Sequence, residues 1–130
     1  AAPRLPPGSS AYRICGVRHA ETGPFQHITV WLPPTIGKAL SEEDITKGSL
    51  IGAIERLLNT PIKFLEQTVD AALAPRTVAE MLQLRARTPL LLFERIYFAA
   101  SGEPVEYALT YQTSRRYPYR VALSRSDRRS

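Results

Sequence analysis

Two strands joined by a turn are predicted by the stretch LLLFERIYFAASGEPVEYALTY, residues 90–111. β-Branched and aromatic residues favour strands at 90–98 and 105–111, and glycine and proline at 101–104 favour a turn. Side chains alternate between the two faces of a strand, so one face of the second strand carries Tyr107, Leu109 and Tyr111. The other face carries Glu106, Ala108, Thr110 and Gln112. We interpret the aromatic face as core, and the opposite face either lines a pocket or meets water.

A second hairpin is predicted near the start of the chain. Residues 11–20 alternate between apolar and polar side chains, residues 21–24 (ETGP) form a turn signal, and residues 25–32 resemble a returning strand. The two hairpins resemble each other at an offset of about 80 residues, which indicates an imperfect internal duplication or a chance similarity. A duplication predicts two related hairpins packed into one antiparallel sheet.

Helices are predicted between the hairpins. Ser41 and Asp44 have the spacing of an N-terminal cap. A stronger helical pattern follows Gly48-Ser49, because apolar residues recur on one face at Leu50, Ile51, Ile54, Leu57 and Leu58. A further helix is expected to begin at Pro75 and to turn three residues inward: Val78, Met81 and Leu82.

The remaining segments complete an α+β pattern. Residues 62–73 alternate like a strand, and a final short strand is expected at 117–123. Residues 1–10 contain three prolines and resemble a linker or lead-in. We therefore expect a central antiparallel sheet flanked by helices, with one domain at 11–123 and an arginine-rich tail at 124–130.

Composition excludes several classes of protein. The chain has 130 residues, of which 44% are hydrophobic and 22% charged, as in one ordinary globular domain. The longest apolar run, residues 90–93, is far shorter than the roughly 20 residues of a membrane span. One cysteine, Cys15, forms no internal disulfide, and with His19 and His27 it supplies too few ligands for a zinc site. We expect no metal and no cofactor.

The net charge of +5 is concentrated at one end of the chain. Residues 1–114 hold 11 basic and 11 acidic side chains, whereas residues 115–130 hold six arginines and one aspartate. Such a tail is either solvated or in contact with the phosphates of a polyanion.

No catalytic signature is present, and the polar residues that remain suit ligand binding better than catalysis. Ser49 at a helix entrance offers a hydroxyl beside free backbone N–H groups, although it is equally suited to capping the helix. Arg18 ends a strand and can hold a carboxylate or phosphate, or it lies in solvent beside Glu21. Glu106 and Gln112 supply a carboxylate and an amide on one strand face.

A family resemblance is carried by these same segments. In the first half the matching residues are Leu5, Gly8-Ser9, Val17-Arg18, Gly23-Pro24 and Trp31-Leu32-Pro33. In the second half they are Ala79, Leu82, Leu84, Pro89-Leu90-Leu91, Glu94-Arg95, Gly102-Glu103-Pro104-Val105-Glu106 and Arg116-Tyr117. In order and spacing they resemble a UTRA domain, the effector-binding module of the HutC branch of GntR-type bacterial transcription regulators.

The resemblance implies a chorismate-lyase-like fold, a ligand pocket between sheet and helices, and a homodimer joined partly through the sheet. It implies that a winged helix–turn–helix domain, absent from this chain, binds DNA, and that the protein is cytoplasmic rather than membrane-bound. We expect no enzymatic activity. Two alternatives are a dimerisation module with a vestigial pocket and, with less support, an enzyme of the chorismate-lyase type.

The resemblance also implies three ligand-binding residues: Arg18, Ser49 and Glu106. Gln112, on the same strand face as Glu106, is our fourth candidate ligand-binding residue. This chain departs from the family pattern at Gly16, where another arginine is common, at Ile28, where an acid is common, and at Gln112, where a tyrosine is common. Arg115 likewise replaces an acid. These departures predict an effector that carries a carboxylate, phosphate or hydroxyls but less charge than a sugar phosphate.

Overall fold

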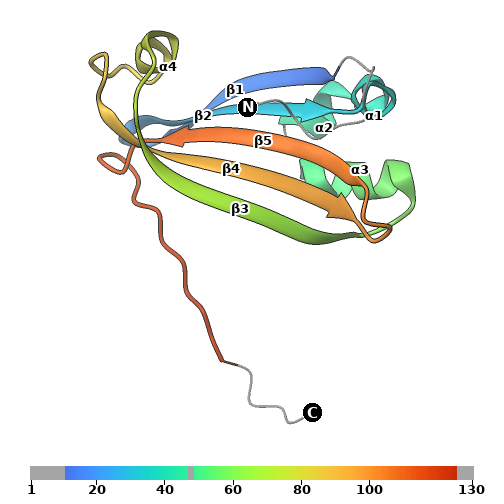
Figure 1. Cartoon of the computed structure of the whole chain (residues 1–130). Coiled ribbons are helices and arrows are strands. Elements are labelled where there is room, and N and C mark those ends of the chain that lie inside the picture. The colour runs from blue at the N-terminus through green and yellow to red at the C-terminus, as the bar shows by residue number, and fades with distance from the viewer. Residues whose placement is uncertain (1–10, 47–48, 126–130) are drawn as a thin grey trace.

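The protein folds around one antiparallel sheet of five strands (Figure 1). The computed structural model describes residues 11–46 and 49–125, so the predicted lead-in at 1–10 and tail residues 126–130 lie outside the described residues. The strands are β1 (Tyr12–Ala20), β2 (Gly23–Leu32), β3 (Ile62–Leu73), β4 (Pro89–Ala99) and β5 (Pro104–Gln112). Their order in the sheet is β1-β2-β5-β4-β3. The predicted α+β class is therefore confirmed.

Both predicted hairpins form, and they meet in the middle of the sheet. β2 pairs with β5 so that Gln26 lies opposite Gln112 and Val30 opposite Ala108. The predicted strand at 62–73 is β3, which pairs with β4 and leaves its other edge unpaired among the described residues. The sheet is thus two hairpins joined side by side, with β3 added beside β4, so that β1 and β3 are the edge strands.

The described residues form four helices, which cover parts of both faces of the sheet: α1 (Pro34–Ala39), α2 (Glu42–Thr46), α3 (Leu50–Leu58) and α4 (Arg76–Met81). Ile36 and Ile54 of α1 and α3 pack against Val30 and Ala108, and we call this side of the sheet the α3 face. Helix α4 packs against Leu90 on the opposite side, the α4 face. The first three helices gather at one end of the sheet and α4 lies at the other (Figure 1).

Local signals position α2 and α3. Ser41 and Asp44 exchange hydrogen bonds between side chain and backbone, each 3.0 Å long, which confirms the predicted cap before α2. The predicted helix after Ser49 is α3, and it ends at Asn59 in the left-handed conformation (φ 52°). No helix in the described part of the chain is long and apolar enough to cross a membrane.

Three expectations about local structure were wrong or incomplete. Met81 is 49% exposed, because the short helix α4 buries only one side, formed by Val78, Ala79 and Leu82. Helix α1 was not predicted, although Pro34 suits its first turn. Both edges of β5 are occupied by β2 and β4, so the chain that leaves β5 has no free strand beside it, and residues 117–123 form no strand.

Aromatic contacts replace strand pairing in the segment after β5. The ring centroids of Tyr117 and Phe25 lie 4.5 Å apart, and those of Tyr119 and Phe93 lie 4.7 Å apart. These contacts hold the segment to the sheet without regular secondary structure.

Candidate ligand-binding site

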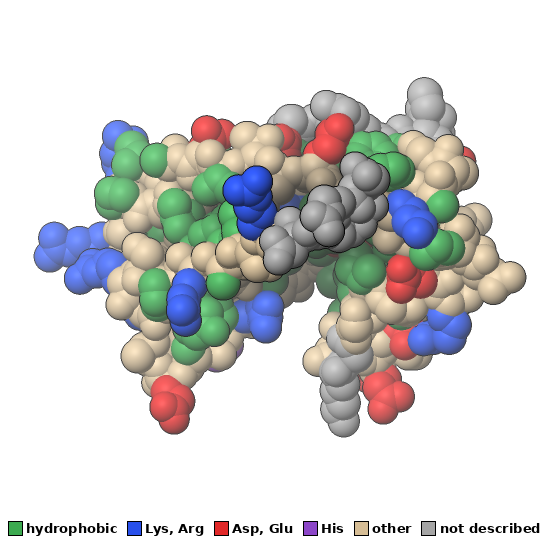
Figure 2. All heavy atoms as spheres, turned by 90° about the horizontal axis from the view of Figure 1, so that it is seen from below, with side chains coloured by type: hydrophobic (Ala, Val, Ile, Leu, Met, Phe, Trp, Pro, Cys, Tyr) green, Lys and Arg blue, Asp and Glu red, His purple; other side chains and the backbone are tan. Residues whose placement is uncertain are grey.

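A cavity of about 670 Å³ lies between the β1–β2 hairpin and helices α2 and α3. The sheet side is lined by β1 and β2, including Ile14, Gly16, Arg18, Ile28 and Val30. The helical side is lined by Ile45 and Thr46 of α2 and Leu50 of α3. The space-filling view from below shows a deep notch in the molecule with hydrophobic side chains beside it (Figure 2). The cavity is large enough for a small organic molecule.

Arg18 is the only charged residue among the described residues that line the cavity. Its side chain is exposed and makes no hydrogen bond or ion pair with the described part of the chain. The neighbouring position on the same face, Gly16, has no atom within 4 Å of where a Cβ would lie. The cavity therefore has apolar walls, free space at Gly16 and a single guanidinium group available to an anion.

Ser49 lies next to this cavity at the start of α3. Its hydroxyl oxygen accepts a hydrogen bond of 3.1 Å from the backbone N–H of Gly52, as the cap interpretation predicts. The following residue, Leu50, lines the cavity. The hydroxyl is thus engaged in the helix cap at the cavity's edge.

Glu106 lies deeper on the α3 face, and its side chain is 4% exposed. One carboxyl oxygen, Oε1, is buried with no hydrogen-bond partner among the described residues. Burial raises the pKa of Glu106 to about 7, although the charge of nearby Arg95 acts to lower it. Glu106 is therefore a buried acid that exchanges a proton near neutral pH. It lies on the same sheet face as the cavity but is not part of its lining.

Gln112 is buried and both ends of its amide are engaged. Its Oε1 accepts a hydrogen bond of 2.7 Å from Nε2 of Gln26, and its Nε2 donates one of 3.0 Å to the carbonyl of Tyr117. Strand pairing places Arg18, Gln26 and Gln112 side by side across three strands. Gln112 is thus hydrogen-bonded both to Gln26, the strand neighbour of Arg18, and to the segment after β5.

The structure brings Arg18 and the entrance of α3 to one cavity, and it places Glu106 and Gln112 on the same sheet face. It also corrects our view of that face in β5. Glu106, Ala108, Thr110 and Gln112 are all buried, so the expectation that this face of β5 meets water is wrong. The sequence analysis did not identify the cavity residues Ile45 and Thr46. The cap at Ser41 was the available signal for the helix that carries them.

Other polar side chains lie on the α4 face, and among them Cys15 is also one of the residues that line the cavity. The Cys15 thiol, which had no assignable partner in the sequence, lies 3.5 Å from Nε2 of His27. Burial lowers the pKa of His27, so this imidazole is neutral near pH 7. The hydroxyl of Tyr107 donates a hydrogen bond to Glu94. In the ranges 11–46 and 49–125, no group of three His, Cys, Asp or Glu side chains is placed to hold a metal ion.

The domain is therefore an antiparallel sheet with helices on both faces and a cavity between the β1–β2 hairpin and helices α2 and α3. The model of the UTRA domain family matches residues 1–118 of this chain. The chain is also 30% identical over 120 residues to the HTH-type transcriptional regulator Rv0792c of Mycobacterium tuberculosis (strain ATCC 25618 / H37Rv). That match covers 87% of this chain and 44% of the regulator, so the chain spans less than half the length of this relative.

Solved structures show the same fold. A GntR-family transcriptional regulator from Enterococcus faecalis V583 superposes with a TM-score of 0.83 at 22% identity, covering 92% of this chain and 86% of that one. The ligand-binding domain of a GntR-family regulator from Bordetella bronchiseptica superposes with a TM-score of 0.78 at 24% identity, covering 90% and 75%. The chain belongs to the UTRA domain family, and the relative that is 30% identical to it is a transcriptional regulator.

Proposed function

We propose that this domain senses a small-molecule effector for a transcription regulator and transmits the binding event to an attached DNA-binding domain. The observation that supports this most directly is the cavity of about 670 Å³ with Arg18 in its wall, in a domain of the UTRA family. Arg18, Ser49, Glu106 and Gln112 are the proposed binding residues. Gln112 contributes indirectly, because its amide is already hydrogen-bonded.

The effector that fits this cavity is a small molecule with an apolar body and one carboxylate. Isoleucine, valine and leucine side chains form most of the lining, which favours burial of hydrocarbon. The single guanidinium of Arg18 suits one anionic group, since the two N–H groups of an arginine fork match the two oxygens of a carboxylate. A sugar phosphate would leave several hydroxyls against apolar walls without hydrogen-bond partners.

The proposed mechanism is a shift between two arrangements of a regulator dimer. Effector bound between the β1–β2 hairpin and helices α2 and α3 contacts two separate structural units, a strand pair and a helical cluster. The effector therefore favours the dimer arrangement in which the hairpin and the helices are spaced so that both contact it. The equilibrium moves only by the difference between the effector's affinities for the two arrangements.

Replacing Arg18 with alanine is expected to weaken binding of a carboxylate effector by about 1.5–3 kcal/mol, or roughly 10- to 150-fold in Kd. The reason is the loss of a charge-assisted hydrogen bond at the only cation in the described lining. A thermal-unfolding screen comparing apolar carboxylates with their amides, sugar phosphates and amino acids would first identify a ligand. Isothermal titration calorimetry would then give Kd for both variants.

The matched control is Arg13→Ala, because Arg13 lies on the same strand and points to the opposite face of the sheet. Its Kd is expected to stay within twofold of the parent value. Equal affinity in the parent and the Arg18→Ala variant would remove Arg18 from the site. A folded dimer that responds to no compound would favour the alternative, a dimerisation module with a vestigial pocket.

A homodimer joined through the sheet is part of this proposal. β3 is a twelve-residue edge strand whose other edge is unpaired among the described residues. It exposes apolar side chains on the α3 face, with Leu65 50% and Val69 43% exposed. A long edge strand with exposed apolar side chains can pair with another strand, and a second copy of β3 supplies one.

Replacing Val69 with lysine is expected to raise the dissociation constant of this dimer at least about tenfold, because each copy would bring an unpaired charge into an apolar interface. Sedimentation velocity over a range of concentrations measures the change. Met81→Lys is the control, since Met81 is similarly exposed on α4. An equal effect of both substitutions, or a monomeric parent domain, would contradict a dimer through β3.

We also propose that the domain binds its ligand without transforming it, and that it functions in the cytoplasm. Its relatives are transcription regulators, which supports a binding role. Release of pyruvate when the purified domain is incubated with chorismate would instead support the chorismate-lyase-type alternative.

A further inference from the structure

A second, smaller cavity lies at the α4 end of the molecule, between the loop after α4 and the segment after β5. Its volume is about 360 Å³, and Gln83, Leu84, Arg85, Arg115 and Arg116 line it. The lining contains three arginines and no acidic side chain. The side chains of Arg85 and Arg115 are exposed and make no hydrogen bond or ion pair within the described part of the chain.

Arg116 fixes the shape of this cavity. Its guanidinium donates hydrogen bonds to three carbonyl groups, those of Pro24 in the β1–β2 hairpin and of Leu82 and Gln83 at the end of α4. The carbonyl of Arg116 accepts a further hydrogen bond of 2.8 Å from the Thr22 hydroxyl. Three separate segments are therefore tied together at one residue, and Arg85 and Arg115 line the same cavity beside it.

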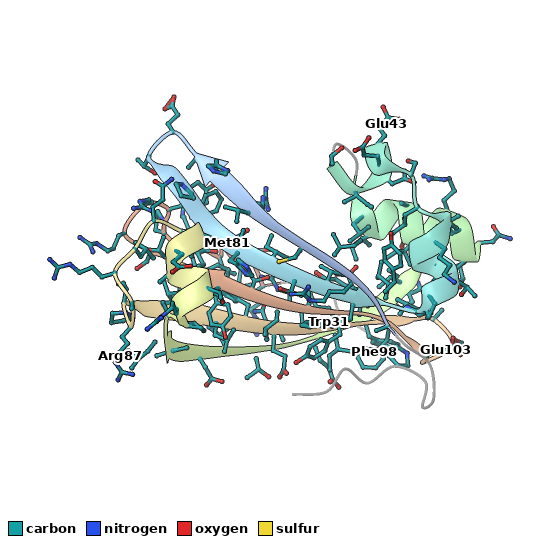
Figure 3. All side chains as sticks on the ribbon, turned by 90° about the horizontal axis from the view of Figure 1, so that it is seen from above. Trp31, Glu43, Met81, Arg87, Phe98 and Glu103 are labelled. Carbon is teal, nitrogen blue, oxygen red and sulfur yellow. The ribbon has the colours of Figure 1, made fainter. Side chains whose placement is uncertain are left out.

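Further basic residues lie near this cavity. Arg87 lies at the α4 end of the molecule (Figure 3). The segment that leaves the cavity carries Arg120 and Arg125, while residues 1–114 are neutral overall. A local cluster of basic side chains of this kind attracts a polyanion electrostatically.

We propose that this arginine-lined cavity binds a phosphate group of the DNA backbone, so that the sensor domain itself contacts the DNA beside the operator. Arg85 and Arg115 hold the phosphate, Arg116 is a positioning residue, and the arginines of the following segment extend the contact along the duplex. A phosphodiester backbone fits better than an isolated anion because the basic residues continue from the cavity into the tail. The contact is independent of the effector cavity at Arg18.

The test is fluorescence anisotropy of a labelled duplex of about 20 base pairs and arbitrary sequence, titrated with the whole chain between 50 and 200 mM NaCl. The double variant Arg85→Gln/Arg115→Gln is compared with Arg13→Gln/Lys63→Gln. The control removes the same charge from exposed positions on β1 and β3. Arg116 is left intact because its substitution would disturb the fold.

We expect the parent chain to bind the duplex with an affinity that falls steeply with salt. The double variant should lose at least about tenfold in affinity at low salt, and its salt slope should fall by about one for each lost phosphate contact. The control variant should lose less than threefold. Equal losses in both variants, or no binding at 50 mM NaCl, would overturn the proposal.

A further experiment distinguishes a DNA phosphate from a free anion as the ligand of this cavity. If inorganic phosphate stabilises the parent chain against thermal unfolding but not the double variant, and the duplex does not bind, the cavity is a small-anion site and the DNA contact is wrong. Effector binding is measured separately by calorimetry. If the DNA contact proves wrong, the proposed sensor function is therefore not contradicted.

Discussion

Replacing Gly37 with alanine is expected to destabilise the domain by about 2–3 kcal/mol and to lower Tm by roughly 5–15 °C. Gly37 is buried in α1 where this helix crosses β1, and an added Cβ would lie 2.1 Å from Cγ and 2.4 Å from Cβ of Tyr12. The Cβ of Tyr12 is attached directly to the strand backbone, so the clash is relieved only if helix and strand move apart. Thermal unfolding followed by circular dichroism measures the effect.

Gly16→Ala is the control for this substitution. Gly16 lies on the same strand as Tyr12, and nothing lies within 4 Å of the position of its Cβ. This variant should unfold within a few degrees of the parent. Equal unfolding temperatures for Gly37→Ala and Gly16→Ala would show that α1 does not pack as closely against β1 as described above.

Replacing Glu106 with glutamine is expected to stabilise the domain above neutral pH and to leave its stability near pH 5 almost unchanged. Burial raises the pKa of Glu106 from 4.5 to about 7, so between these values the folded protein keeps a proton that the unfolded chain releases. The associated stability is fully present below pH 4.5 and is lost as the pH rises through about 7. Above that pH the charged carboxylate costs about 3 kcal/mol.

Glutamine has nearly the shape of the protonated acid and carries no charge, so it removes this cost. The measurement is Tm at pH 5 and pH 8 for the parent, Glu106→Gln and Glu103→Gln. Glu103 lies exposed in the β4–β5 turn, so its substitution should change neither value. Equal Tm differences at the two pH values for Glu106→Gln would show that its carboxyl does not titrate in this range.

Local patterns predicted most of the elements because the forces that form them act over a few residues. The alternation in residues 11–20 and 90–98 identified two hairpins, and the apolar spacing from Leu50 identified α3, in agreement with the structure. The prediction was wrong at Met81 because a helix of six residues has too few turns to define its buried side from spacing alone. It was wrong at 117–123 because strand formation depends on a free neighbouring strand.

The candidate site was predicted only in part, for a similar reason. Family resemblance and residue type identified Arg18 and Ser49, which the structure places in the wall of one cavity and beside it. The apolar walls come from α2 and β2, and no pattern within either segment shows that they face each other. Arg116 was counted with a basic tail, whereas three carbonyl groups from distant segments engage it.

The sequence by itself determined the α+β class, the two hairpins, the UTRA resemblance and the position of the excess charge, because each depends on residue order and local spacing. Only the tertiary structure decided that β2 pairs with β5, that Glu106 is buried with a pKa near neutrality, and that arginines from two segments converge beside α4. Burial and convergence depend on contacts between residues far apart in the chain. Those contacts are set when the whole sheet assembles, and the free energy of burying a charge or an apolar wall follows from them.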